Sequence, residues 1–203
     1  MINGSRAATR FISLVLLVVL HMAGCTNSND TSSTDGESHG GAGDLPGPLP
    51  SDVAFRKPPR SAVAAPDFSA DLLDGTPVTA SDLWDDRPLV LMFTASWCDR
   101  CADVHRAVAG VVDEHEGAIG LLGVVPADDA EGARGYAQDL QLGHPIAVGD
   151  ESVWLNYAAD EPPLVALIAP GGKILRGWPG GVHAADLAGH LEKLFEPSTA
   201  EGG

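Results

Sequence analysis

Two uninterrupted apolar runs mark the centre of the sequence, at residues 89–93 and 119–125. Runs of this kind are typical of strands that are buried on both faces of a sheet. Shorter apolar runs at 146–148 and 164–168 predict two further strands, and the second of these would form a hairpin with 173–178 across a Pro-Gly-Gly turn. Apolar residues three and four positions apart predict helices at 102–112, 128–141, 151–158 and 182–195.

A smaller set of elements is expected ahead of the first buried strand. Residues 65–68 (Ala-Pro-Asp-Phe) begin an extended stretch, and Asp74-Gly75 has the turn chemistry of a β-hairpin. Residues 79–84 predict a short helical turn with Ser81 as its N-terminal cap. Strands that alternate with helices, followed by a hairpin and a final helix, predict an α/β sandwich with a mixed central sheet.

The first 24 residues have the layout of an export signal. A basic start is followed by residues 11–20, which are apolar except for one serine and are too few to span a bilayer, which needs about 20 residues. The Ala-Gly pair before Cys25 resembles the lipobox of bacterial lipoproteins, in which the cysteine is acylated and becomes the mature N-terminus. We therefore expect a signal peptide at 1–24 and lipidation of Cys25, with an ordinary secretory signal and an incidental cysteine as the alternative.

Composition divides the rest of the chain. Residues 26–60 are rich in Ser, Thr, Gly, Asp and Pro and contain few large apolar residues, so they predict a flexible tether. We accordingly expect a lipid-anchored tether at 25–61, one folded domain at 62–196 and a disordered tail at 197–203. About 135 residues are enough to bury a core without additional cross-links.

The charge and the cysteine count narrow the function. A formal net charge of −16 argues against nucleic-acid binding, so we expect no nucleic-acid partner. Of three cysteines, one would be the lipid anchor, and the other two form the motif Trp97-Cys98-Asp99-Arg100-Cys101 at the start of a predicted helix. The unpaired N–H groups at a helix start lower the pKa of a thiol there. Two cysteines at this spacing can close a disulfide and exchange two electrons, which makes the pair a redox-site candidate.

The same residues allow other interpretations of the cysteine pair. A zinc site needs four ligands, and beside Cys98, Cys101 and His105 only the distant His144 or His183 could complete it. A c-type haem site requires histidine directly after the second cysteine, where the sequence has alanine. The Pro-Thr-Cys setting of a peroxiredoxin is absent, and a purely structural disulfide across so short a gap constrains little chain entropy.

The motifs together resemble the thioredoxin-fold thiol–disulfide oxidoreductases, and within them the exported TlpA/ResA-like branch of the redoxin (AhpC/TSA) family. The resemblance rests on the Ala-Pro-Asp-Phe stretch at 65–68, the Asp74-Gly75 hairpin, the strand leading into Trp97-Cys98-Asp99-Arg100-Cys101, and Pro163 ahead of a strand–turn–strand segment. It covers about residues 62–196. The fold it implies is a thioredoxin-like three-layer α/β/α sandwich with a mixed central sheet and an N-terminal hairpin.

The resemblance also implies roles for individual residues. Cys98 would be the attacking thiolate, and Cys101 the buried thiol that resolves the mixed disulfide. Trp97 would cover the pair. Pro163 aligns with the family's cis-proline, which faces the disulfide and shapes the substrate groove.

Three features depart from the family pattern. The acids that relatives place near the buried cysteine fall at Met92 and Val104, so the proton acceptor of Cys101 is open. Asp103 and His105 are near in sequence, but on a helix they point away from the Val104 face. A proton relay through either of them is the alternative to a missing acceptor. Pro162 precedes the aligned cis-proline and lacks the N–H that relatives offer to a bound partner. Finally, the charges of the intervening Asp-Arg pair oppose each other, so the reduction potential does not follow from the sequence.

The expected function follows from this resemblance. It implies an exported, membrane-anchored oxidoreductase that reduces disulfides of exported client proteins, as in cytochrome c maturation, and needs no cofactor beyond the Cys98–Cys101 disulfide. Its electron donor would be a membrane thiol transporter, and the protein would be a monomer on the extracytoplasmic side of the bacterial membrane, in the cell envelope. The alternative is a non-catalytic thioredoxin-fold binding module or copper carrier.

Overall fold

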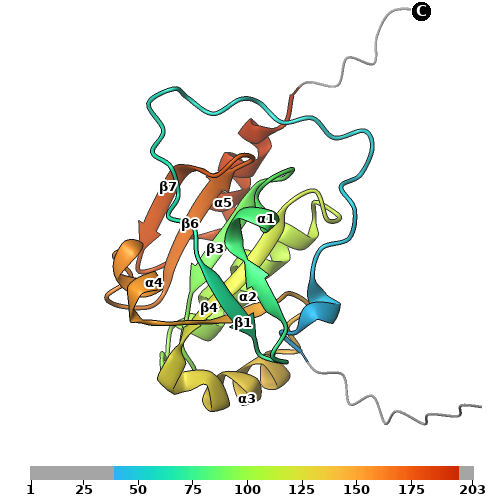
Figure 1. Ribbon diagram of the computed structural model, residues 1–203. Helices are drawn as coiled ribbons and strands as arrows, with labels where there is room; N and C mark the ends of the chain where they lie inside the picture. The colour runs from blue at the N-terminus through green and yellow to red at the C-terminus, as the bar shows by residue number, and fades with distance from the viewer. Residues whose placement is uncertain (1–38, 197–203) are drawn as a thin grey trace, which may run out of the picture. The chain divides into compact units, whose positions relative to one another are not determined.

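A mixed seven-stranded sheet forms the centre of the computed structural model, which describes residues 39–196 (Figure 1). The strand order is β2-β1-β5-β4-β3-β6-β7. Strands β3, β4 and β5 are parallel to one another. On one side of them the β1–β2 hairpin pairs antiparallel with β5 through β1, and on the other side the β6–β7 hairpin pairs antiparallel with β3 through β6. The strands are β1 Ser69–Leu72, β2 Pro77–Thr79, β3 Leu89–Phe93, β4 Gly120–Pro126, β5 Ile146–Gly149, β6 Leu164–Ala169 and β7 Lys173–Pro179.

Helices cover both faces of the sheet. Helices α2, α3 and α5 pack on one face, where their buried residues join those of the central strands, and α1 and α4 pack on the other. The helices are α1 Ala80–Leu83, α2 Cys101–Asp113, α3 Ala130–Leu140, α4 Glu151–Asn156 and α5 Ala184–Leu191, with short 3-10 turns η1 Ala42–Asp44, η2 Ala127–Asp129 and η3 Glu192–Leu194. The predicted thioredoxin-like three-layer sandwich with an N-terminal hairpin is therefore confirmed. Among residues 39–196, no helix has the length and apolar character needed to cross a membrane.

The central strands explain why the two apolar runs were informative. All five residues of β3 are buried, because β3 lies between β4 and β6 and has helices over both of its faces. Its even-numbered residues, such as Met92, join the cluster under α2 and α5, and its odd-numbered residues, such as Phe93, join the cluster under α1 and α4. Alternation across the sheet thus divides one continuous run between two cores.

Two local expectations at helix ends need correction. Ser81 is not the cap of α1 but lies inside it, and the N-cap residue Thr79 makes no side-chain capping bond. The carboxylate of Asp67 instead accepts hydrogen bonds from the backbone N–H groups of Ser81 and Phe68, each at 2.9 Å. The predicted final helix at 182–195 is divided into α5 and η3.

The segment ahead of the domain packs against it. Figure 1 shows the chain running from η1 across the upper end of the sheet and back to the hairpin. Phe55 pairs with Phe195 in an isolated β-bridge, with their rings 5.4 Å apart, and Ala64 pairs with Lys173. Backbone hydrogen bonds and apolar contacts thus attach parts of residues 39–61, which composition predicts to be a flexible tether, to the domain.

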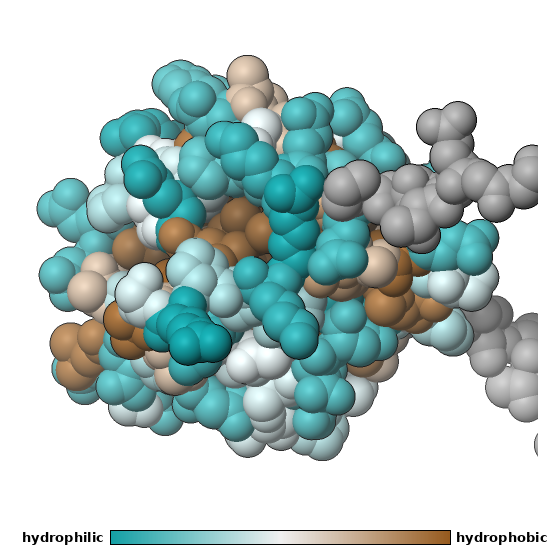
Figure 2. Space-filling model, turned by 90° about the horizontal axis from the view of Figure 1, so that it is seen from above, coloured by the Kyte–Doolittle hydropathy of each residue, from teal (hydrophilic) through white to brown (hydrophobic). Residues whose placement is uncertain are grey.

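The end of the domain that this segment crosses is remote from Cys101, since α2 begins at Cys101 and ends at Asp113 near that end. Figure 2 shows it as a mostly hydrophilic surface with apolar residues at the floor of a central hollow. The predicted signal peptide, Cys25 and the tail at 197–203 lie outside the described residues.

Candidate active site

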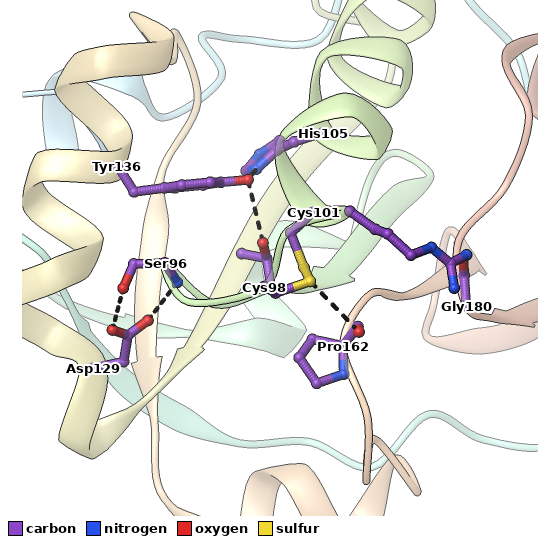
Figure 3. Close-up of a disulfide and its surroundings, with 10 residues drawn as sticks. Ser96, Cys98, Cys101, His105, Asp129, Tyr136, Pro162 and Gly180 are labelled. Atoms are coloured by element: carbon purple, nitrogen blue, oxygen red, sulfur yellow. Dashed lines mark hydrogen bonds between the residues drawn. A yellow bond between two sulfur atoms is a disulfide. The ribbon is translucent and has the colours of Figure 1, made fainter.

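A disulfide joins Cys98 and Cys101 at the point where β3 has ended and α2 begins (Figure 3). The two cysteines differ in accessibility: Cys101 is 0% exposed, whereas Cys98 is partly exposed. A turn holds them, in which the N–H of Cys101 donates to the carbonyl of Cys98 at 3.0 Å. The start of α2 favours a thiolate on this turn once the disulfide is reduced.

A cis peptide bond joins Pro162 to Pro163, as the resemblance implied, and it lies beside Cys98 of the disulfide. The carbonyl oxygen of Pro162 lies 3.5 Å from Sγ of Cys98 (Figure 3). In the disulfide this is a contact only, because the sulfur carries no proton, but a reduced Cys98 thiol could donate to the same oxygen. Pro162 therefore presents an acceptor to the site and no donor.

A loop after β7 closes the same side of the site. Gly181 has a φ of +96°, and a Cβ there would lie 2.8 Å from Val104 and 3.3 Å from Pro163. The neighbouring Gly180 accepts a hydrogen bond from the Arg100 guanidinium at 2.6 Å. Small residues are thus required where this loop approaches α2 and the cis-proline.

The partly exposed sulfur opens into a surface groove of about 390 Å³. Trp97 lines this groove with 64% of its surface exposed, so it borders the disulfide rather than burying it. Three exposed carboxylates line it as well, with Arg100 as the basic residue. These carboxylates belong to Asp99, Asp160 and Glu161.

A buried carboxylate holds the loop before the cysteines. Asp129, which is 8% exposed, accepts hydrogen bonds from the backbone N–H and the hydroxyl of Ser96, at 2.6 and 2.5 Å (Figure 3). A carboxylate bound to two donors positions this loop more firmly than a neutral acceptor would. The sequence alone does not reveal this pair, because 33 residues separate its members.

Two histidines form a buried polar cluster behind the disulfide. His105, one turn after Cys101 on α2, is 0% exposed, and His144 is 8% exposed. Their Nε2 atoms lie 2.5 Å apart, and Nδ1 of His105 lies 2.9 Å from the hydroxyl of Tyr136. The Tyr136 hydroxyl is in turn 3.3 Å from Oγ1 of the buried Thr94.

Burial sets the protonation of this cluster. Desolvation, together with the electrostatic effect of His144, holds the pKa of His105 well below its ordinary value of 6.5. Desolvation lowers the pKa of His144 to about 4 and raises the pKa of Tyr136 above 10.0. All three side chains are therefore neutral at pH 7, and one histidine donates to the other.

Comparison with known proteins agrees with this geometry. The sequence profile of the AhpC/TSA family matches residues 62–174. The chain belongs to the AhpC/TSA family. No curated protein matches the chain significantly in sequence.

Solved structures of similar fold are numerous. A thiol–disulfide oxidoreductase from Bacteroides fragilis has a TM-score of 0.57 at 24% identity, over 64% of this chain and 98% of that one. An exposed lipoprotein thioredoxin from Streptococcus pneumoniae has a TM-score of 0.56 at 23% identity, over 64% and 100%. A secreted disulfide oxidoreductase from Mycobacterium tuberculosis has a TM-score of 0.55 at 18% identity, over 62% and 94%. At these identities the likeness shows the fold.

Within the AhpC/TSA family, the Cys-x-x-Cys disulfide identifies the chemistry. The chain is a thioredoxin-like thiol–disulfide oxidoreductase, and membership implies exchange with protein thiols. Met92 and Val104, where the resemblance implied an acid, are apolar: Met92 is fully buried, and Val104 packs against the cluster under α2 and α5. Asp103 is exposed and pairs with Arg106 at 3.2 Å, so of the two polar neighbours only His105 is buried near the disulfide.

Several other aromatic and histidine side chains have packing roles. Trp84 is buried, Trp154 packs against Phe93, and Trp178 packs against His190, while His115 stacks on Phe195. Within the stretch 39–196, no three His, Cys, Asp or Glu side chains are grouped so that they could hold a metal ion.

Proposed function

We propose that this family member is an exported, membrane-anchored reductant of disulfides in exported client proteins, such as those of cytochrome c maturation. The observation that carries the proposal is the asymmetry of the disulfide: one sulfur opens into the groove beside the cis-proline, and the other is fully buried. Cys98 then serves as the attacking thiolate and Cys101 as the resolving thiol. The export signal and Cys25 motif support the location, with Cys25 lipidated in the bacterial cell envelope.

The reaction has two exchange steps. The Cys98 thiolate attacks a client disulfide, a mixed disulfide forms, and one client sulfur leaves as a thiolate. Cys101 then attacks Sγ of Cys98, which releases the second client sulfur and leaves the Cys98–Cys101 disulfide. A membrane thiol transporter returns two electrons to the pair. Trp97 and Pro162 border the groove in which the client chain binds, and the buried Pro163 shapes it through the cis peptide bond to Pro162.

A trapping experiment tests the client step. The full-length Cys101→Ser protein is expressed in its bacterial host and purified under non-reducing conditions, and disulfide-linked exported proteins are identified after release with dithiothreitol. We expect capture by Cys101→Ser and none by the matched control Cys98→Ser/Cys101→Ser. Absence of any exported protein in the first sample would refute the client-exchange proposal.

The direction of electron transfer and the lipid anchor need separate measurements. Equilibration with glutathione or dithiothreitol buffers should give a potential near or below about −250 mV for a reductant, whereas a value near about −120 mV would identify an oxidant. Fatty-acid labelling should be lost in Cys25→Ala, and labelling equal to the wild type would refute the lipid anchor.

A further inference from the structure

The buried position of Cys101 raises a problem of proton transfer. Resolution of a mixed disulfide requires the Cys101 thiol to lose its proton, since the thiolate is the nucleophile. Cys101 is 0% exposed, so bulk water does not reach it directly. Met92 and Val104, which lie on the two elements that flank this cysteine, are apolar, and neither can accept a proton.

A chain of hydrogen-bonding groups lies immediately behind this cysteine. His105 follows Cys101 by four residues, which places the two side chains on the same face of α2, about 5–6 Å apart at Cβ. From His105 the contacts continue in two directions. Nδ1 faces the Tyr136 hydroxyl (Figure 3), which in turn contacts Thr94, and Nε2 contacts His144. The opposing element, β4, has Gly123 at this level, and a Cβ there would lie 3.8 Å from the His105 ring.

The outer end of this chain reaches a second surface groove. His144 is among the residues that line a depression of about 390 Å³ between η1 and the C-terminal end of α2. Besides His144, the titratable groups of this groove are Asp44, Asp113 and Glu116, and no lysine or arginine lines it. The groove therefore offers carboxylates and water to a proton that arrives at His144.

We propose that His105, Tyr136 and His144 form the proton path that connects the buried Cys101 to this second groove. The inference deepens the proposed function, because it assigns the proton transfer of the resolving step. In that step the S–H bond of Cys101 breaks and its proton enters the path at the Tyr136 hydroxyl oxygen. The hydroxyl passes its own proton to Nδ1 of His105, His105 passes its Nε2 proton to Nε2 of His144, and His144 releases its Nδ1 proton to water. The Cys101 thiolate forms a bond to Sγ of Cys98, the bond between Cys98 and the client breaks, and the client sulfur leaves as a thiolate that takes a proton from solvent.

The protonation state of the histidines suits proton transfer rather than proton storage. A neutral imidazole carries one N–H and one free lone pair, so it can accept a proton on one nitrogen while it releases one from the other. Since burial disfavours the charged ring, the proton does not rest on either histidine. The electrons pass only between sulfur atoms, and no further oxidant or reductant is needed.

The test separates the two sulfur exchanges with a small disulfide, oxidised glutathione, and the full-length protein. Attack by Cys98 is measured alone in a Cys101→Ser background. Resolution of the mixed disulfide by Cys101 is measured with both cysteines present, by rapid acid quench and quantification of the mixed disulfide that remains at each time. We expect Tyr136→Phe and His105→Gln to leave the attack rate within twofold and to slow resolution at pH 7 at least tenfold, with a smaller deficit at pH 9.5, where hydroxide removes the proton.

The pH dependence of resolution distinguishes proton transfer from a structural role, because only a proton-transfer defect is relieved at pH 9.5. His115→Gln serves as the matched control because that histidine lies outside the cluster. Tyr136→Phe removes one oxygen and keeps the ring, so it tests the path even if His105→Gln fails to fold. Equal loss in the attack and resolution steps, or unchanged resolution at every pH, would overturn the path.

Glutathione replaces the client in this design, so its outcome is independent of client identity. Failure to trap an exported protein would refute the proposed function without affecting the proton path. Normal resolution kinetics in Tyr136→Phe would refute the path without affecting the proposed function.

Discussion

Acidification from pH 7 to pH 5 is expected to destabilise the folded domain through the buried pair His105 and His144. Both side chains are neutral in the folded state, because burial lowers the pKa of each ring. In the unfolded chain the same rings are solvated and have the ordinary pKa of 6.5. The unfolded state therefore binds more protons below pH 6.5, and the free energy of unfolding falls as the pH falls.

The magnitude follows from the size of the shift. For His144, a pKa of about 4 in the folded state against 6.5 in the unfolded state corresponds to a loss of about 2 kcal/mol between pH 7 and pH 5. His105 contributes in the same direction. The stabilisation is fully present above pH 6.5 and declines until the pH reaches the folded-state pKa. Hydrogen bonds from the Ala42 N–H to Asp74, and from the Ser152 hydroxyl to Asp150, lower the pKa of these carboxyls, so their titration lies below this range.

Urea unfolding of the oxidised protein at pH 7, 6 and 5, followed by tryptophan fluorescence, measures this loss. His144→Gln should be less stable at pH 7, because it disturbs the histidine pair, but should show a shallower decline toward pH 5. His190→Gln is the control and should keep the wild-type slope. A free energy of unfolding that is constant from pH 7 to pH 5, or an unchanged slope in His144→Gln, would refute the reasoning.

Three further predictions concern the residues around the disulfide. Asp129→Asn should lower the free energy of unfolding by about 1–3 kcal/mol in urea, because it weakens both bonds to the loop before the cysteines, whereas Asp128→Asn, an exposed neighbour, should have little effect. Gly181→Ala should cost about 1 kcal/mol or more on account of its positive φ and its close approach to α2, while Gly177→Ala, which meets open space, should not; equal Tm values for the two variants would contradict this. Asp99→Asn removes a negative charge beside Cys98 and should raise the reduction potential by about 10 mV in glutathione buffers, and a lowered potential would show that the carboxylate acts otherwise.

The sequence alone determined the fold class and the reacting pair. Continuous apolar runs at 89–93 and 119–125 correspond to β3 and β4, because a central parallel strand has no exposed face and needs no polar position. The Cys98–Cys101 spacing at the start of a helix likewise depends only on neighbours along the chain. Local patterns are sufficient where the physical cause is itself local.

The polar groups around the disulfide could not be derived in this way. His105 lies between Cys101 and Val108 on the buried stripe of α2, and that spacing was a signal of burial available in the sequence. Its partner His144, however, is 39 residues away, and only the parallel pairing of β4 with β5 brings the two rings together. The same holds for Asp129, which reaches Ser96 only because β4 lies beside β3 in the sheet.

The attachment of residues 39–61 was also decided by tertiary structure. This stretch has few large apolar residues and no periodicity, so composition predicts a tether. The folded domain supplies what the segment lacks: Phe195 packs against Phe55, and exposed backbone groups of the domain pair with those of the segment. A sequence determines which segments can form a core by themselves, whereas contacts between distant segments arise only on a surface that the folded chain has already formed.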